Sequence, residues 1–157
     1  MRLYCVRHGQ PEPATAELAD PGLSSEGRQS VESMAAFLAE RLRPITFVCT
    51  SPKQRTKETA DIFHNALKVT DSLQEMTELR PSQSAESMAE LAWTWQEDRL
   101  LVGHNPMMGE LVSQLILGAP GQEIVRFTPG TMVCLERQQS GCWILNWVMR
   151  PELLAHF

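Results

Sequence analysis

The sequence predicts an α/β protein: a three-layer α/β/α sandwich with a mostly parallel sheet and an antiparallel C-terminal hairpin. Two observations favour this fold. Short apolar runs alternate along the chain with longer segments whose apolar residues recur at helical spacing. The last part of the chain departs from that alternation, because two strand-like runs follow one another directly.

The N-terminal segment predicts a strand, a loop and a helix. The run from Arg2 to Arg7 is typical of a buried strand, and a polar loop with three prolines follows from Gly9 to Gly22. We expect the helix to have Ser24 as its N-cap and to end before Pro44. Its apolar stripe consists of Val31, Met34, Ala35, Leu38, Ala39 and Leu42.

The middle of the chain repeats the order of strand and helix. Phe47 to Cys49 predicts a second strand, and Ser51-Pro52 resembles an N-cap followed by proline at the first helical position. Leu100 to Val102 predicts a later strand, and Asn105-Pro106 repeats the cap-plus-proline pattern. The inner faces of the helices carry Ile62, Phe63, Ala66 and Leu67; Met88, Leu91, Ala92 and Trp95; and Met108, Leu111, Val112, Leu115 and Ile116.

The remaining segments complete the sheet. A short third strand is expected at Val69, a loop over residues 73–81 and a helix over residues 87–95. Residues 132–135 and 143–149 predict an antiparallel hairpin at the edge of the sheet. In the second strand of this hairpin, the alternating residues Trp143, Leu145, Trp147 and Met149 are expected on one face.

Length and composition indicate one domain over residues 1–157 and exclude several classes of partner. The net charge is 14 − 19 = −5 and no basic run occurs, so no nucleic-acid or membrane partner is expected. No signal-peptide core is visible, and we expect a cytoplasmic protein. Cys5 and Cys49 are expected to be buried thiols, and a disulfide between Cys134 and Cys142 is not expected in the cytosol.

Polar groups follow three of the predicted parallel strands. The first strand ends in Arg7-His8-Gly9, the second is followed by Arg55 in the first helical turn, and a later strand is followed by His104. The carboxyl ends of parallel strands meet at one edge of an open sheet, where ligands bind. The sequence therefore predicts that two histidines and two arginines share a site at that edge.

These residue types suit a tetrahedral phosphate dianion. Each guanidinium, of Arg7 and of Arg55, can hold two phosphoryl oxygens. A neutral imidazole is a competent nucleophile toward phosphorus, and nearby arginines help to keep His8 neutral. Gly9 leaves space beside that nucleophile and tolerates unusual backbone angles. The residues alone leave two alternatives open, which are strand-end histidines without chemistry and zinc bound by His8 and His104. Zinc is disfavoured because the arginines repel a cation and no HxxxH or HxH motif occurs.

Four segments, in this order and spacing, resemble the histidine phosphatase superfamily, which includes the phosphoglycerate mutases. They are residues 3–9, ending in Arg-His-Gly, and residues 23–27, 50–60 and 102–106. The resemblance implies a phosphoglycerate mutase-like fold and a phosphohistidine intermediate on His8. It also implies a phosphate pocket of Arg7, Gly9, Arg55 and His104, with no metal and no cofactor.

The short chain is most similar to the SixA-type phosphohistidine phosphatases. Mutase-like members are longer and carry an insertion that supplies a general-acid glutamate. Residues 77–81 resemble the Glu-Leu-x-Pro segment of the SixA type, and residues 146–149 resemble its Asn-Trp-x-Met ending. Gln10 departs from the pattern, since SixA has an aspartate there. Glu78 is the best candidate for a general acid, with a solvated loop carboxylate as the alternative.

We expect the substrate to be phosphohistidine on a protein, either a phosphotransfer domain or a phosphotransferase-system protein. A phosphoramidate can leave as neutral imidazole once its ring is protonated, so it needs less acid help than an alkoxide does. A small phosphate ester hydrolysed by the same chemistry is the first alternative. A phosphate-binding module without turnover is the second.

Overall fold

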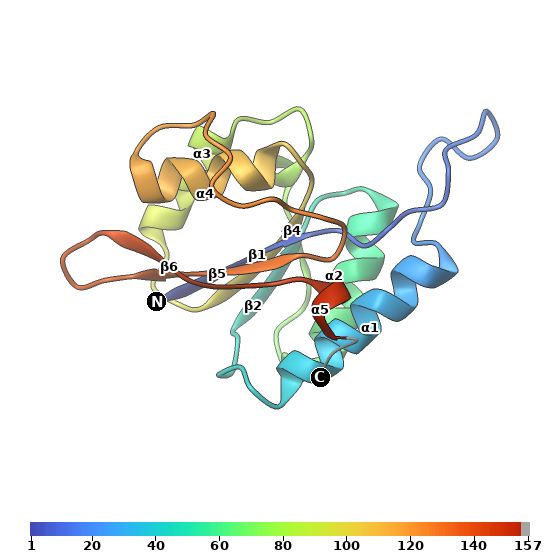
Figure 1. Cartoon of the computed structure of the whole chain (residues 1–157), viewed down its shortest axis with the longest axis horizontal. Coiled ribbons are helices and arrows are strands. Elements are labelled where there is room, and N and C mark those ends of the chain that lie inside the picture. The colour runs from blue at the N-terminus through green and yellow to red at the C-terminus, as the bar shows by residue number, and fades with distance from the viewer. Residues whose placement is uncertain (155–157) are drawn as a thin grey trace.

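The computed structural model describes residues 1–154, which form a six-stranded sheet with helices on both faces (Figure 1). The strands are β1 (Arg2–Arg7), β2 (Phe47–Thr50), β3 (Gln74–Glu75), β4 (Arg99–Gly103), β5 (Met132–Arg137) and β6 (Trp143–Met149). The helices are α1 (Ser25–Ala39), α2 (Gln54–Ala66), α3 (Ala85–Thr94), α4 (Met107–Leu117) and α5 (Pro151–Leu154), with a 3-10 turn, η1, at Thr77–Leu79.

The sheet has the strand order β3-β2-β4-β1-β5-β6. The pairs β2–β3, β2–β4 and β1–β4 are parallel, whereas β5 pairs antiparallel with β1 and with β6. The predicted fold class, a mostly parallel sheet with an antiparallel C-terminal hairpin, is therefore confirmed. The central position of β1 and β4 places the ends of both strands in the middle of one sheet edge.

Two apolar layers cover the sheet. Alternate residues of β1 point to opposite faces, so Leu3 and Cys5 pack beneath α3 and α4, while Tyr4 and Val6 pack against α1 and α2 (Figure 1). All four side chains are fully buried. A strand with both faces covered needs a continuous apolar run, which explains the sequence of β1. No helix within residues 1–154 is both long enough and apolar enough to cross a bilayer.

The cap predictions have mixed outcomes. Ser24 caps α1 as predicted, because its side chain accepts a hydrogen bond from Gly27 N. The caps predicted at Ser51 and Asn105 are wrong. The helix α2 begins at Gln54 after Lys53, and α4 begins at Met107 after Pro106, each without a side-chain cap.

The edges of the sheet differ most from the predictions. The third strand is not at Val69, which is buried outside the strands, but at β3 inside the predicted loop 73–81. Two residues are too few to show an alternating pattern. The prediction of one common face for β6 is also wrong. Its pairing register shifts between Cys134 and Leu135, which reverses the alternation, so Trp143 packs on the α3/α4 side and Trp147 on the α1/α2 side.

Candidate active site

The ends of the parallel strands bring the predicted residues together. Arg7 pairs with Gly103 across β1 and β4, so the following residues, His8 and His104, come out side by side. Their ring centroids lie 5.1 Å apart with the ring planes at 61°. The two imidazoles therefore lie side by side at the sheet edge, and their joint role in one phosphate site stays a prediction.

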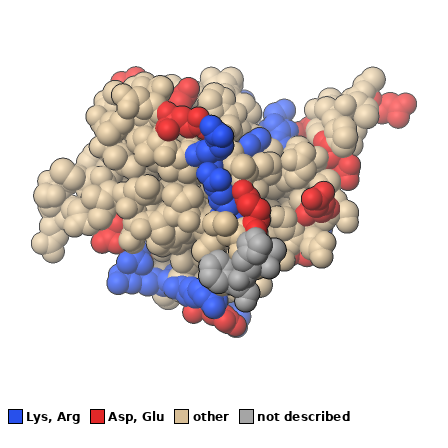
Figure 2. Space-filling model, in the orientation of Figure 1, with Lys and Arg blue, Asp and Glu red and all other residues tan. Residues whose placement is uncertain are grey.

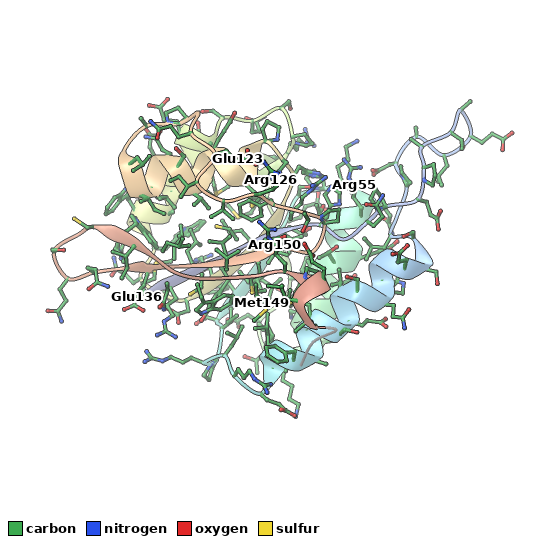
Figure 3. All side chains as sticks on the ribbon, viewed as in Figure 1. Arg55, Glu123, Arg126, Glu136, Met149 and Arg150 are labelled. Carbon is green, nitrogen blue, oxygen red and sulfur yellow. The ribbon has the colours of Figure 1, made fainter. Side chains whose placement is uncertain are left out.

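Arg55 lies between the two imidazoles. It belongs to the first turn of α2, at the end of that helix nearest to the end of β1 (Figure 3). Its Nε donates to His8 Nε2 at 3.2 Å, and one terminal nitrogen lies 3.4 Å from His104 Nδ1. Its other terminal nitrogen lies 3.6 Å from Asp20 Oδ1. A guanidinium carries only donors, so both ring nitrogens that face Arg55 present lone pairs.

The backbone fixes the orientation of His8. Its Nδ1 lies 2.7 Å from the carbonyl oxygen of Gly9, which can only accept, so the proton is on Nδ1 and the lone pair on Nε2. The N–H of Gly9 in turn donates to Thr59 Oγ1 at 3.1 Å. Gly9 has no left-handed φ; its requirement is space, because a Cβ would come within 2.6 Å of Val31. Glycine therefore allows α1 to pack against the histidine-bearing turn.

Burial keeps both imidazoles neutral. The exposed fraction is 6% for His8 and 2% for His104. Burial lowers the pKa of His8 to about 4, and the positive charges of Arg55 and Arg7 act in the same direction. Burial lowers the pKa of His104 to about 3, with further lowering by His8 and Arg55. At neutral pH both rings are therefore uncharged, as a nucleophilic imidazole has to be.

Arg7 is held by a loop that gave no sequence signal. Its NH1 donates to the carbonyl oxygen of Phe127 at 2.8 Å, and Asn105 Nδ2 donates to the same oxygen at 3.2 Å. The side chain of Asn105 is thus taken by Phe127 instead of capping α4. A backbone carbonyl has no residue signature, so the sequence could not identify Phe127.

Two further side chains at the site were missed. Ser51 Oγ lies 2.7 Å from His104 Nε2, and Thr56 Oγ1 lies 2.7 Å from Ser51 Oγ. Both side chains are fully buried. A signal for Ser51 exists in the sequence, since it follows directly on a strand end, but the Ser-Pro pair equally predicts a helix cap. Asp20, which contacts Arg55, lies in the long loop after β1 and gave no signal of its own.

The acid candidate is less closely tied to this cluster. Glu78 lies on η1, which follows β3 at the same edge of the sheet, and Thr77 Oγ1 lies 3.4 Å from its carboxylate. Within residues 1–154 it has no hydrogen bond to His8 or His104. The same part of the chain holds no group of three His, Cys, Asp or Glu side chains arranged for a metal ion.

Comparison with known proteins assigns the family. Residues 3–95 match the family model of the histidine phosphatase superfamily (branch 1). The chain belongs to the histidine phosphatase superfamily. As a histidine phosphatase it is an enzyme, and the predicted resemblance to the SixA type is confirmed by its relatives.

Three of those relatives can be aligned with this histidine phosphatase over nearly its whole length. The phosphohistidine phosphatase SixA of Escherichia coli (strain K12) is 24% identical over 96% of this chain and 94% of that protein. The structure of the protein histidine phosphatase SixA complexed with tungstate has a TM-score of 0.87 at 25% identity, covering 98% and 99% of the two chains. A SixA structure from Agrobacterium tumefaciens has a TM-score of 0.79 at 23% identity, covering 96% and 97%.

Proposed function

We propose that this histidine phosphatase removes phosphate from phosphohistidine on a protein, with His8 as the transient phosphate acceptor. One observation carries the proposal: two buried, neutral imidazoles direct their lone pairs at the same guanidinium. An anion that enters this cluster meets Arg7 and Arg55 as cations and His8 Nε2 as a nucleophile. The relatives named phosphohistidine phosphatase support the choice of substrate. Tungstate in one of them is a tetrahedral oxyanion, as phosphate is.

The reaction has two steps. His8 Nε2 attacks the phosphorus, and the bond from phosphorus to the substrate ring breaks, so that its electron pair returns to that ring. If the other nitrogen of the substrate ring carries a proton, the leaving group is neutral imidazole. Water then attacks the phosphohistidine on His8, and phosphate leaves. Arg7, Arg55 and His104 hold the phosphoryl oxygens in both steps, and Gly9 positions His8 through its carbonyl group.

The phosphoramidate leaving group agrees with the sparse acid groups at the site. An alkoxide would need a proton donor such as Glu78, whereas a substrate ring that already carries a proton on its other nitrogen leaves as neutral imidazole. We assign Glu78 a secondary role that matters only for ester substrates. Small phosphate esters are therefore expected to be poorer substrates than a phosphohistidine protein.

A cytoplasmic location fits this role, and the state of the cysteines supports it. Cys5, Cys49, Cys134 and Cys142 are all free thiols, and the first three are buried. On the face shown in Figure 2, basic side chains form small groups with acidic ones beside them. This pattern suits a protein substrate better than a polyanion.

The decisive experiment follows radioactive phosphate from a labelled phosphohistidine protein. Wild type is expected to release phosphate and to form an acid-labile phosphoenzyme in a rapid quench. His8→Ala is expected to do neither, and His64→Ala, which changes a histidine on the outer part of α2, is expected to do both. Turnover by His8→Ala would contradict the nucleophile. Faster turnover of sugar phosphates or nucleotides than of the phosphoprotein would favour an esterase. Binding of the phosphoprotein without release of phosphate would favour a binding module.

A further inference from the structure

A line of buried hydroxyl groups runs from His104 away from the phosphate pocket. His104 Nε2 lies 2.7 Å from Ser51 Oγ, which lies 2.7 Å from Thr56 Oγ1. The line ends at the carbonyl oxygen of Lys53, 2.7 Å from Thr56 Oγ1. Ser51 and Thr56 are fully buried, and His104 is 2% exposed, so solvent does not compete for these bonds.

The carbonyl acceptors beside Thr56 favour one direction for the hydrogen bonds along this line. A carbonyl oxygen only accepts, and Thr56 Oγ1 lies 2.7 Å from Lys53 O and 3.0 Å from Ser51 O, so both carbonyls are acceptors for its single proton. With the proton of Thr56 on either carbonyl, Ser51 Oγ donates its own proton to Thr56 Oγ1 and accepts from Lys53 N at 3.3 Å. The oxygen of Ser51 then has only acceptor capacity left, and His104 Nε2 must carry the proton that points at it.

The opposite side of the ring gives the same answer independently. A terminal nitrogen of Arg55 lies 3.4 Å from His104 Nδ1, and a guanidinium nitrogen can only donate. Nδ1 is therefore the unprotonated nitrogen. Two contacts on opposite sides of one ring thus select the same tautomer, with the proton on Nε2 and the lone pair facing the pocket.

We propose that Ser51 and Thr56 are positioning residues that lock His104 in the Nε2–H tautomer and so make its Nδ1 the proton acceptor of the phosphate pocket. This inference rests on the proposed function for its catalytic meaning. A neutral Nδ1 cannot donate to a phosphoryl oxygen. His104 therefore binds the phosphoryl group only with a proton between them, which arrives on a monoanionic phosphoryl group or is taken up with the dianion.

The surroundings of His104 explain why that proton is absent before substrate binds. The charged and titratable groups that face the ring are Arg7 at the end of β1, His8 directly after β1, Arg55 from α2 and Lys53 from the turn before α2. These groups are cationic or neutral. A phosphoryl dianion reverses the sign of the local field and raises the affinity of Nδ1 for a proton. While the phosphoryl group binds, Ser51 Oγ continues to accept the hydrogen bond from Nε2–H of His104, so the imidazole ring keeps its orientation.

The test uses nitrogen-15 NMR of the imidazole rings in the free full-length protein. Wild-type His104 is expected to show a protonated Nε2 and an unprotonated Nδ1. Thr56→Val removes the acceptor of the Ser51 hydroxyl at nearly constant volume, so this hydroxyl can turn and donate to Nε2. The population with the proton on Nδ1 should then rise, and Thr56→Ser should restore the wild-type tautomer. Ser113→Ala is the matched control, because it removes a buried hydroxyl of α4 that donates to Ala119 O just beyond the end of that helix.

Kinetics on the labelled phosphoprotein provide the second measurement. Thr56→Val should lower kcat/KM about five- to tenfold, as expected for one lost hydrogen bond, while Thr56→Ser and Ser113→Ala stay within about twofold. A proton on Nδ1 of wild-type His104, or an unchanged tautomer in Thr56→Val, would overturn the proposal. Failure of wild type to form a phosphoenzyme, with the tautomer as expected, would instead overturn the proposed function alone.

Discussion

The neutral pair of histidines should make the protein acid-sensitive well above the range in which carboxylates titrate. An exposed histidine has a pKa of about 6.5, whereas those of His8 and His104 are lowered to about 4 and about 3. At pH values between these lowered pKa values and 6.5, both histidines bind protons in the unfolded chain but stay neutral in the folded chain. The free energy of unfolding therefore falls as the pH decreases through this window, and it is fully retained above the ordinary histidine pKa.

The size of the effect follows from the two pKa differences. Lowering the pH from 7 to 5 costs about 2 kcal/mol for each histidine that stays neutral in the folded state. The pair therefore accounts for about 3 to 4 kcal/mol, a large part of the stability of a domain of this size. Both side chains are almost fully buried, so screening by solvent does not reduce this figure substantially.

Urea unfolding followed by tryptophan fluorescence at pH 7 and pH 5 measures this loss directly. His8→Asn and His104→Gln should each retain only about half of the wild-type loss, since one titrating imidazole remains. His64→Gln, which changes a histidine at the surface of α2, should retain nearly all of it. The reasoning is refuted if both buried-site variants lose as much stability as wild type between the two pH values.

Two further predictions concern the shape of the site. Arg55→Lys keeps a positive charge but loses the planar fork that contacts both imidazoles, so kcat/KM should fall about 30- to 1000-fold. The control Arg126→Lys, on an exposed loop, should change kcat/KM less than about twofold. Equal activity of both variants would contradict the bridging role of Arg55. Gly27→Ala places a Cβ against the backbone of Gln10, two residues after His8, and should lower the free energy of unfolding by about 1–3 kcal/mol and reduce activity. Gly109→Ala in α4 meets no neighbouring atom within 4 Å and should stabilise by about 0.5–1 kcal/mol; the same loss in both variants, measured by thermal unfolding, would exclude the packing argument.

The sequence was sufficient for those parts of the site that depend on the parallel sheet. Arg7, His8 and His104 follow continuous apolar runs, and such runs become buried parallel strands whose ends share one edge. Arg55 was placed correctly because a helix begins a few residues after β2. In these cases a local apolar pattern identifies the strand or helix, and the parallel arrangement of the strands brings the residues that follow them to one edge of the sheet.

The sequence failed where a side chain is used by a distant partner. Ser51-Pro52 has the local features of a helix cap, yet the hydroxyl binds an imidazole 53 positions away. Asn105 has the same features, yet its amide binds the carbonyl oxygen of Phe127. Capping competes with any stronger acceptor or donor nearby, and only the assembled fold brings that competitor close. The two-residue β3 and the register shift in β6 could not be predicted for a similar reason, because pairing between strands determines both.

The contacts of Arg55 indicate how a closed cluster can still accept phosphate. In the proposed mechanism a phosphoryl group has to reach His8 Nε2 and His104 Nδ1, two of the three atoms that the guanidinium of Arg55 contacts within residues 1–154, so both bonds are exchanged when substrate binds. The third partner, Asp20, lies on the far side of the guanidinium at 3.6 Å and can stay in place during that exchange. An arginine held by three exchangeable bonds would move with its ligand. We therefore expect that Asp20 keeps Arg55 in place while the phosphoryl oxygens replace the imidazoles around it, which would leave His8 Nε2 free to attack in the proposed mechanism.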